Sequence, residues 1–157
     1  MNVRIGRNSN KITYRSVTTN EVSSALELAW RVFLQFEAPE YSKEGVTSFY
    51  DSIHNPEFIN QLKVYGAFLG EEMVGMLATR SNGAHVALFF VEAKYQGQGI
   101  GKQLFGLAVK NNEIGTITVN SSPYAVGIYH KLGFVDTNTE QVTDGIRYTP
   151  MIYRGGN

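Results

Sequence analysis

Apolar side chains recur every three to four positions in two stretches near the start of the chain. Residues 20 to about 37 carry them at helical spacing, and Pro39 ends this stretch. The second stretch follows Ser42, a residue type that caps helices, and stops before Pro56. Residues 11–17, which precede both, have the pattern of a strand. We therefore expect a strand followed by two amphipathic helices.

The rest of the chain has the shorter spacing of strands, interrupted by two more helices. Residues 85–91 look buried on both faces, and the Asn82-Gly83 pair before them is a strong hairpin signal. Strands are expected at residues 64–69, 73–79, 85–91, 116–120, 134–142 and 146–153, and helices at residues 99 or 100 to about 111 and 124–132. The predicted fold class is α/β (α+β), with a mixed, mostly antiparallel sheet of about seven strands flanked by four helices.

Length and composition are typical of one folded domain. The 157 residues are 43% hydrophobic and 18% charged, which is enough apolar material for a core without disulfides or a metal. Residues 1–10 are polar and are expected to be a flexible N-terminus, so that residues 11–157 form a single domain. The 14 basic and 14 acidic residues balance, which argues against nucleic acid or an anionic membrane as a partner.

Few types of reactive side chain are present. The absence of cysteine excludes a disulfide framework, a thiolate metal site and a cysteine nucleophile. The three histidines, His54, His85 and His130, lack the spacing of metal ligands, so no metal is expected. The start of the chain has no apolar signal segment, and no apolar run is long enough to span a bilayer. We therefore expect a cytoplasmic location.

A glycine-rich turn, YQGQGIGK at residues 95–102, lies between a predicted strand and a predicted helix. Backbone N–H groups and the helix dipole at such a helix start form an anion site, and glycines let phosphate oxygens approach it. The nucleoside-triphosphate loop is excluded because Gln96 and Gln103 stand where its motif needs glycine and serine or threonine. The dinucleotide motif fails because Lys102 replaces its third glycine. The turn predicts another phosphate ligand, and a ligand-free tight turn is the alternative.

The motif that remains is Gln96-x-x-Gly99-x-Gly101, and with it the chain resembles the GNAT (Gcn5-related) superfamily of N-acetyltransferases. That family carries [Q/R]-x-x-G-x-[G/A] after its fourth strand. Residues 121–134 look like a later helix of the family, which ends in Tyr-x-x-x-Gly-Phe. The resemblance covers residues 11–153 and implies a sheet that is splayed between strands 4 and 5. It departs at Ser122, where many relatives carry asparagine.

The resemblance implies that acetyl-CoA is the cosubstrate. Its diphosphate is expected on the amides of the glycine turn, and its pantetheine arm along the strand at residues 85–91. The expected cofactor-binding residues are Phe89, Phe90, Val91, Gln96, Gly97, Gln98, Gly99, Ile100, Gly101, Lys102, Ser122, Tyr124 and Ala125. A backbone cradle of this kind explains how a chain without net charge would bind a polyanion.

Acetylation of an amine needs a base, because a free primary amine is protonated near neutral pH. His85 is expected in this role, since members of the family carry histidine or glutamate at that offset on the fourth strand. The alternatives are a structural role for His85, and Glu92 or a chain of waters as the base. Tyr129 stands where the family places a tyrosine beside the cofactor sulfur, and is expected to protonate the leaving thiolate. A purely structural role in the core is the alternative for Tyr129.

The acceptor site of this family is built from the first two helices and the last hairpin. Glu37 and Tyr41 lie where these helices meet, and a carboxylate there would select a cationic amine. The alternative for each of them is a solvated position in a loop. The expected function is acetyl transfer from acetyl-CoA to a small or peptidyl primary amine, by direct attack in a ternary complex. The alternative is a non-catalytic module of the same fold that binds acyl-CoA as a sensor or scaffold. The acceptor and the use of longer acyl donors stay open, and exposed edge strands allow a homodimer.

Overall fold

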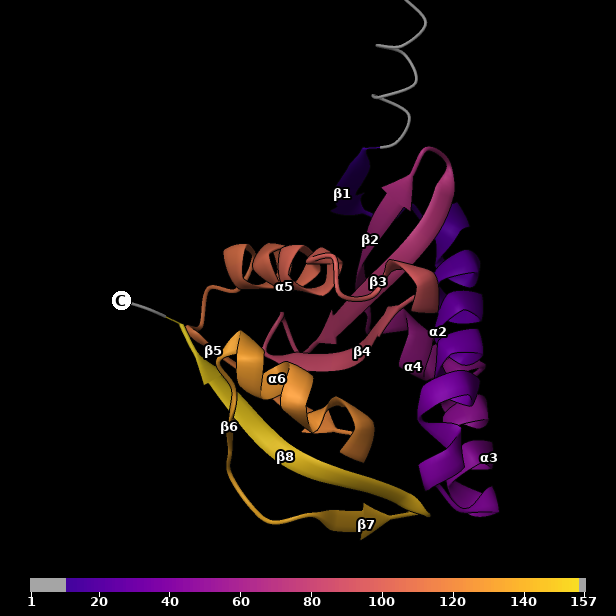
Figure 1. Cartoon of the computed structure of the whole chain (residues 1–157), viewed down its shortest axis with the longest axis vertical. Coiled ribbons are helices and arrows are strands. Elements are labelled where there is room, and N and C mark those ends of the chain that lie inside the picture. Colours follow the sequence, from indigo (N-terminus) through magenta and orange to yellow (C-terminus); the bar gives the residue numbers. More distant parts are fainter. Residues whose placement is uncertain (1–10, 156–157) are drawn as a thin grey trace, which may run out of the picture.

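Eight strands form the sheet in the computed structural model, which describes residues 11–155 (Figure 1). They are β1 (Ile12–Ser16), β2 (Lys63–Leu69), β3 (Glu72–Arg80), β4 (His85–Val91), β5 (Thr116–Ser121), β6 (Val135–Asp136), β7 (Gln141–Thr143) and β8 (Ile146–Arg154). Their order is β1-β2-β3-β4-β5-β8-β6, and β7 pairs with β8 beside this path. Every pair is antiparallel except β4 with β5. The predicted mixed, mostly antiparallel sheet is confirmed.

Helices cover both faces of this sheet and bury two separate apolar clusters. The helices are α2 (Val22–Phe36), α3 (Lys43–Ile53), α4 (Pro56–Asn60), α5 (Ile100–Lys110) and α6 (Val126–Leu132), with 3-10 turns η1 (Thr19–Glu21), η2 (Ala38–Glu40), η3 (Ala93–Tyr95) and η4 (Pro123–Ala125). Leu28 and Phe33 of α2 pack against Leu88 on one face. Leu104 of α5 and Tyr129 of α6 belong to the cluster on the other face. The pairs α2–α3 and α5–α6 are correspondingly separate in Figure 1.

Three details of the fold differ from the predicted elements. The helix after Ser42 stops before Asn55 and Pro56 as predicted, but α4, which starts at Pro56, was not predicted; the Asn55 side chain caps it by accepting from the N–H of Glu57 at 2.9 Å. The predicted strand at residues 134–142 is divided into β6 and β7. β4 is not buried on both faces: its residues alternate between buried and half-buried. The half-buried Ala87, Phe89 and Val91 lie beyond the point where β4 is paired with β5. The expected flexible segment, residues 1–10, lies outside the described residues.

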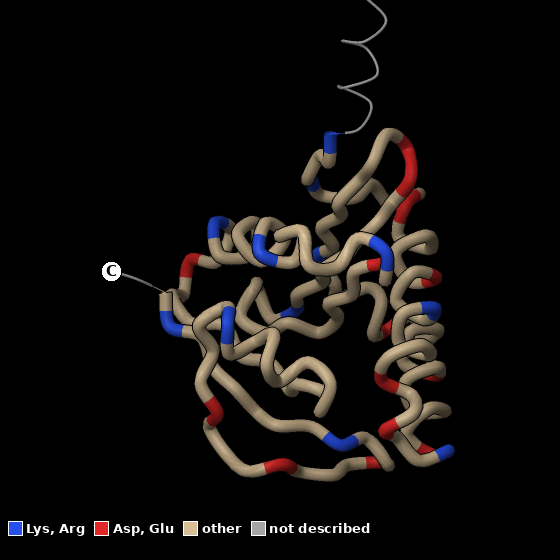
Figure 2. Tube along the Cα trace, in the orientation of Figure 1, with Lys and Arg blue, Asp and Glu red and all other residues tan. Residues whose placement is uncertain are grey.

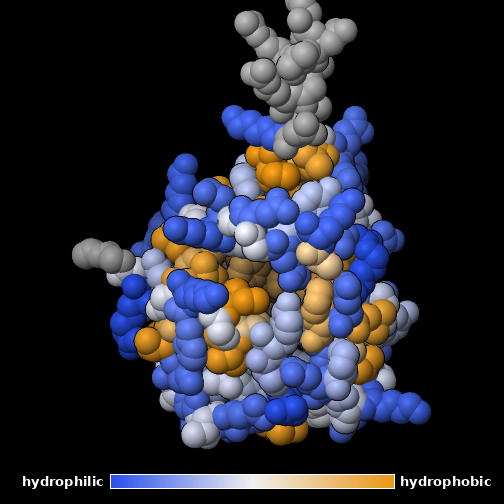
Figure 3. All heavy atoms as spheres, viewed as in Figure 1, coloured by the Kyte–Doolittle hydropathy of each residue, from blue (hydrophilic) through white to orange (hydrophobic). Residues whose placement is uncertain are grey.

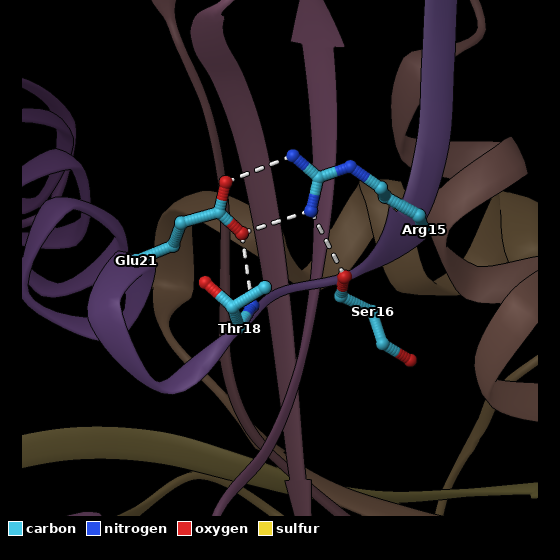
Figure 4. Close-up of polar contacts among 4 residues, drawn as sticks. All are labelled: Arg15, Ser16, Thr18 and Glu21. Carbon is cyan, nitrogen blue, oxygen red and sulfur yellow. Dashed lines mark hydrogen bonds and ion pairs between the residues drawn. The ribbon is translucent and has the colours of Figure 1, made fainter.

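Both long N-terminal helices begin at polar contacts. Arg15 holds the carboxylate of Glu21 with two hydrogen bonds of 2.8 Å, and the same carboxylate accepts from the N–H of Thr18 (Figure 4). This arrangement fixes the chain between β1 and α2. At α3 the hydroxyl of Ser42 accepts from the N–H of Gly45 at 3.2 Å, which confirms Ser42 as the N-cap.

The balanced net charge conceals an uneven distribution along the chain. Residues 21–57, which contain α2, α3 and α4, carry seven acidic and two basic side chains. Residues 93–132, which contain α5 and α6, carry four lysines and one glutamate. Figure 2 shows the acidic positions along α2 and α3 and the basic ones on α5 and α6. The helices on one face of the sheet therefore carry net negative charge, and those on the other face carry net positive charge.

Candidate active site

β4 and β5 are paired at one end only. Their parallel pairing joins His85 to Thr118 and Val86 to Val119, and no further pair follows. Beyond it β5 remains paired with β8 as far as Ser121, and β4 remains paired with β3. The two strands therefore separate after Val86, which confirms the predicted splay between strands 4 and 5.

A β-bulge lies where the separation begins. Ala78 of β3 pairs with Leu88 of β4. The next residue of β3, Thr79, pairs with Val86, so Ala87 is the extra residue. A bulge bends its strand and increases its twist, and such bulges are common next to active sites. This one lies at the residue where the pairing of β4 with β5 ends.

Backbone groups of β4 face the gap. The N–H of Glu92 donates to the carbonyl of Val74 on β3 at 2.9 Å. Because successive N–H groups of a strand point to opposite sides, those of Phe89 and Val91 point away from β3 and into the gap. The carbonyl of Val91 agrees with this orientation, since it accepts from the side-chain amide of Gln96 at 2.9 Å.

The glycine turn after β4 leaves a helix N-terminus open at the mouth of the gap. Gly97 and Gly99 have φ of +79° and +85°, in the left-handed region that other residues adopt at a cost. Gly99 is the N-cap of α5, so the first N–H groups of this helix have no partner within it. A Cβ on Gly101 would lie 3.2 Å from Cζ of Phe89. Glycines thus preserve access to an anion-binding helix start.

A bridge of aromatic and amide groups crosses the gap near this turn. The Tyr124 hydroxyl donates to Oε1 of Gln96 at 3.2 Å. The Tyr124 ring also stacks on Phe36 at the end of α2, with centroids 5.1 Å apart. Gln96 therefore connects β4 to η4, and Tyr124 connects η4 to α2.

A first cavity of about 450 Å³ occupies the gap. Figure 3 shows this face of the molecule hollowed near its middle, with hydrophobic residues around the hollow. The walls are Val32, Phe36, Glu37, Phe89, Phe90, Val91, Tyr95, Gln96, Gly97, Gly99, Ile100, Gly101, Lys102, Tyr124, Ala125, Ile128, Tyr129, Lys131 and Leu132. The cavity thus runs from the N-terminus of α5 to the side chains of Glu37 and Tyr129.

A second, smaller cavity of about 160 Å³ meets the first at its inner end. It is lined by Glu37, Tyr41, Phe49, Val86, Ala87, Leu88, Phe89, Phe90, Val119, Asn120, Ser122, Ala125, Tyr129 and Ile146. Five residues line both cavities: Glu37, Phe89, Phe90, Ala125 and Tyr129. Of these, only Glu37 and Tyr129 carry a side chain that can give or take a proton.

The model of the acetyltransferase (GNAT) domain family matches residues 37–154, three quarters of the chain. This chain belongs to the GNAT family. A GCN5-related N-acetyltransferase from Rhodopseudomonas palustris is 18% identical with a TM-score of 0.77, over 90% of this chain and 94% of its own. The PaiA N-acetyltransferase of Thermoplasma acidophilum, solved in complex with coenzyme A, is 21% identical with a TM-score of 0.71, over 92% and 99%. The comparison with curated protein sequences gave no match. The structural neighbours share the GNAT fold.

Glu37 is one of the two titratable residues at the junction of the cavities. It joins the end of α2 to the start of η2 and is half-buried. Burial raises the pKa of this carboxyl from 4.5 to about 7, the nearby charge of Glu40 adds to the rise, and the Ser122 hydroxyl opposes it. Glu37 therefore changes protonation state near neutral pH, which is the property of a general base.

Tyr129 lies opposite in the same junction. It is 6% exposed, and its ring packs edge-on against Phe89 and Phe134 at centroid distances of 5.9 and 5.1 Å. Burial, followed by the charges of Glu37 and Tyr41, raises the pKa of its hydroxyl well above the ordinary value of 10. The Tyr129 hydroxyl is thus protonated at neutral pH and can donate a hydrogen bond, although burial makes it a weaker acid than an exposed tyrosine.

His85 lines neither cavity at this site. It stands at the paired end of β4 and β5, where its Nδ1 lies 2.8 Å from Oγ1 of Thr118. Burial, with a contribution from the charge of Arg80, lowers the pKa of His85 from 6.5 to about 4. The structure thus brings Tyr129 and Glu37 together but leaves His85 on the far side of the Ala87 bulge.

The other candidate residues are distributed between the two cavities. Tyr41 lines the second cavity, as does Ser122, whose hydroxyl accepts from the N–H of Ala125 at 3.2 Å. Gln98 lines neither, and its side-chain amide donates to the Lys94 carbonyl at 3.2 Å. The remaining predicted cofactor residues all line the first cavity: Phe89, Phe90, Val91, Gln96, Gly97, Gly99, Ile100, Gly101, Lys102, Tyr124 and Ala125.

Sequence reasoning missed wall residues that come from elements far apart in the chain. Phe36 was assigned only to the apolar face of a helix, yet its ring stacks on Tyr124 at the cavity. Lys131 was not assigned, although its side chain lines the first cavity together with Lys102. The spacing of apolar residues in α6 could have indicated which face of this helix lines the cavity. It could not have indicated which helix lies across the cavity from α6.

Two further findings concern the described residues only. Within residues 11–155, no group of three or more His, Cys, Asp or Glu side chains is arranged to hold a metal ion. No helix among the described elements has both the length and the apolar character needed to cross a membrane.

Proposed function

We propose that the chain is an acetyl-CoA-dependent N-acetyltransferase that acetylates a primary amine by direct attack in a ternary complex. The observation that carries this proposal is the meeting of two cavities at Glu37 and Tyr129, a base and an acid, in the gap between β4 and β5. The family is one of acetyltransferases, and one neighbour of the same fold was solved with coenzyme A. The absence of cysteine from the sequence favours direct transfer over an acyl-cysteine intermediate.

The first cavity suits acetyl-CoA in shape and in charge. The open N-terminus of α5 offers N–H groups to a diphosphate, and glycines leave room for it. Lys102 and Lys131 line the same cavity and would face an anionic ligand. The outward N–H groups of Phe89 and Val91 are available to the amides of a pantetheine arm, and Val91 also to the oxygen of the acetyl carbonyl.

Acetyl-CoA supplies the acetyl group as an activated thioester. In the transfer, the C–N bond between the acetyl carbon and the amine forms while the C–S bond to coenzyme A breaks. Glu37 accepts a proton from the ammonium or attacking amine, directly or through one water. Its raised pKa matches this task, because a carboxyl that ionises near pH 7 is partly free to accept a proton and is more basic than an exposed one. Tyr129 donates its hydroxyl proton to the departing sulfur.

Glu37 takes the role that the sequence suggested for His85. His85 lines neither cavity, and its Nδ1 is engaged with Thr118 where the two strands are still paired. Its low pKa also makes it a weaker base than free imidazole. We assign His85 to joining β4 and β5, and Glu37 both to holding the cationic amine and to removing its proton.

The release of coenzyme A thiol from acetyl-CoA, measured with a panel of primary amines, tests this function. The wild-type chain should be active, and kcat/KM should rise through pH about 7 as Glu37 loses its proton. Glu37→Gln should lower kcat by roughly 10² to 10⁴ and remove this rise. Tyr129→Phe should lower kcat by about ten- to a hundredfold, because a thiolate needs less help in leaving than an alkoxide.

Calorimetric titration with coenzyme A should give the same affinity for both variants and for the wild type. The matched control is Glu27→Gln, which makes the same substitution at an exposed position of α2. This variant should keep wild-type kinetics. If His85→Ala removed the pH dependence and Glu37→Gln did not, the base would be His85. If coenzyme A bound but no amine released thiol, the chain would be a non-catalytic binding module.

A further inference from the structure

We infer that the acceptor is a small primary monoamine with an apolar body about the size of a benzene ring, held in the second cavity. This inference rests on the proposed function and narrows its substrate class. It excludes amino acids, polyamines and polypeptide N-termini as preferred acceptors. The inference depends on the size, lining and charge of the cavity that meets the first one at Glu37 and Tyr129.

The size of the second cavity limits what its walls can enclose. Its volume is about 160 Å³. An apolar cavity of about 150 Å³ engineered in another protein binds benzene. One wall is rigid, because the ring of Phe49 lies flat on Phe33 at 3.9 Å and edge-on to Phe90 at 5.9 Å. A phenyl or branched alkyl group would fill this space, whereas a peptide chain would not.

The walls of this cavity are mostly apolar. Most of its lining side chains are hydrocarbon or aromatic, among them Phe49, Ala87, Leu88, Val119 and Ile146. Asn120 and Ser122 are the neutral polar exceptions beside the two tyrosines. Burying a second ammonium against such walls would leave a charge without a partner. A diamine or polyamine therefore fits poorly, since only Glu37 among the lining residues is acidic.

No cationic side chain lines the second cavity among the described residues. The carboxylate of an amino acid acceptor would therefore lie near Glu37 without a positive partner. Arg147 follows the lining residue Ile146 on β8, but its guanidinium is already engaged. It donates to the carboxylate of Glu140 at 2.9 Å and to the carbonyl of Glu40 at 3.3 Å. The geometry thus selects against a carboxylate in the acceptor.

The surrounding charge agrees with a cationic acceptor. The segment at residues 21–57, which supplies Glu37, Tyr41 and Phe49, has five more acidic than basic side chains. A surface of this sign raises the local concentration of an ammonium ion and its rate of association. The apolar body then occupies the second cavity while the ammonium lies at the junction with Glu37.

Pairs of amines that differ by one group test this inference through kcat/KM for thiol release. Phenylethylamine and 3-methylbutylamine should exceed phenylalanine and leucine, which add only a carboxylate, by at least a hundredfold. Phenylethylamine should exceed ethylamine and putrescine by at least tenfold. A peptide with a free N-terminal alanine should be a poor acceptor.

A variant that fills the second cavity tests whether this space is the one used. Ala87→Leu adds three carbons to a lining residue and should lower kcat/KM for phenylethylamine at least tenfold, with ethylamine changed less than threefold. The control is Ala84→Leu, a half-buried alanine of the same segment that lines neither cavity. It should leave both amines unchanged.

The possible failures are distinguishable. Acetylation of amino acids, putrescine or the peptide in preference to the apolar amines would overturn the acceptor class and leave the proposed function standing. Equal loss of both amines in Ala87→Leu would show that the second cavity does not hold the apolar body. Absence of thiol release with every amine, despite binding of coenzyme A, would overturn the proposed function itself.

Discussion

Glu37 combines a position and an environment that no other carboxylate among the described residues shares. It stands where two cavities meet, and burial raises its pKa to about 7. From the sequence, Glu37 was predicted to bind the acceptor because it lies at the end of the first helix. The two cavities that meet beside it form only when distant elements come together, and no local pattern indicates that meeting. For His85 the sequence signal was present but the position is not. Its distance along the chain from Gln96 matched the family pattern, but the Ala87 bulge lies between His85 and the cavities.

The raised pKa of Glu37 has a consequence for stability. The unfolded carboxyl ionises near pH 4.5 and the folded one near pH 7, so the folded state loses stability as pH rises between these values. Glu37→Gln removes this cost. Glu37→Gln should therefore have a higher free energy of unfolding than the wild type at pH 8. This difference should exceed the corresponding difference at pH 5 by on the order of 2 kcal/mol.

Urea unfolding at the two pH values measures this difference. Glu27→Gln is again the control, because the exposed Glu27 side chain should give the same small change at both. A gain for Glu37→Gln that is equal at pH 5 and pH 8 would show that the folded protein does not hold this carboxyl in its neutral form.

At the scale of elements, the glycine turn and α5 form the most predictable part of the site. The spacing Gln96-x-x-Gly99-x-Gly101 indicated an anion-binding helix start, and the structure gives the turn its left-handed glycines and α5 its open N-terminus. The five-residue helix α4 could not be predicted, because it is too short to show a period. The break between β6 and β7 was missed because residues 137–140 are polar and could belong to an exposed edge strand.

Two glycines of α5 offer a matched comparison. A side chain at Gly101 would meet the Phe89 ring, with the Cβ 3.2 Å from Cζ, and would narrow the first cavity beside the helix N-terminus. Gly106 lies on the same helix with no atom within 4 Å of an added Cβ. Gly101→Val should weaken the binding of coenzyme A at least tenfold, whereas Gly106→Val should leave it unchanged.

Calorimetric titration with coenzyme A checks this comparison, and far-ultraviolet circular dichroism shows whether each variant keeps its helix content. Equal affinity of the two variants for coenzyme A would mean that coenzyme A does not bind beside the N-terminus of α5.

For the whole molecule, the sequence predicted the mostly antiparallel sheet and the order of elements apart from α4 and the division of β6 from β7. The splay between strands 4 and 5 was implied by the family resemblance. The sequence could not predict how far the strands separate or what fills the space, since that depends on α2, η4 and α6 meeting across the gap. Phe36, Tyr124 and Gln96 show this dependence, because they come from three distant segments and are joined only in the fold. The separation of acidic and basic sides likewise appears only when the elements are assembled.

The most direct test of the account is a crystal structure of the chain with coenzyme A. We predict the diphosphate on the N–H groups of Gly101 and Lys102, and the sulfur within hydrogen-bond reach of the Tyr129 hydroxyl on the side of the gap that faces Glu37. A diphosphate bound away from the N-terminus of α5, or a sulfur distant from Glu37 and Tyr129, would contradict the account.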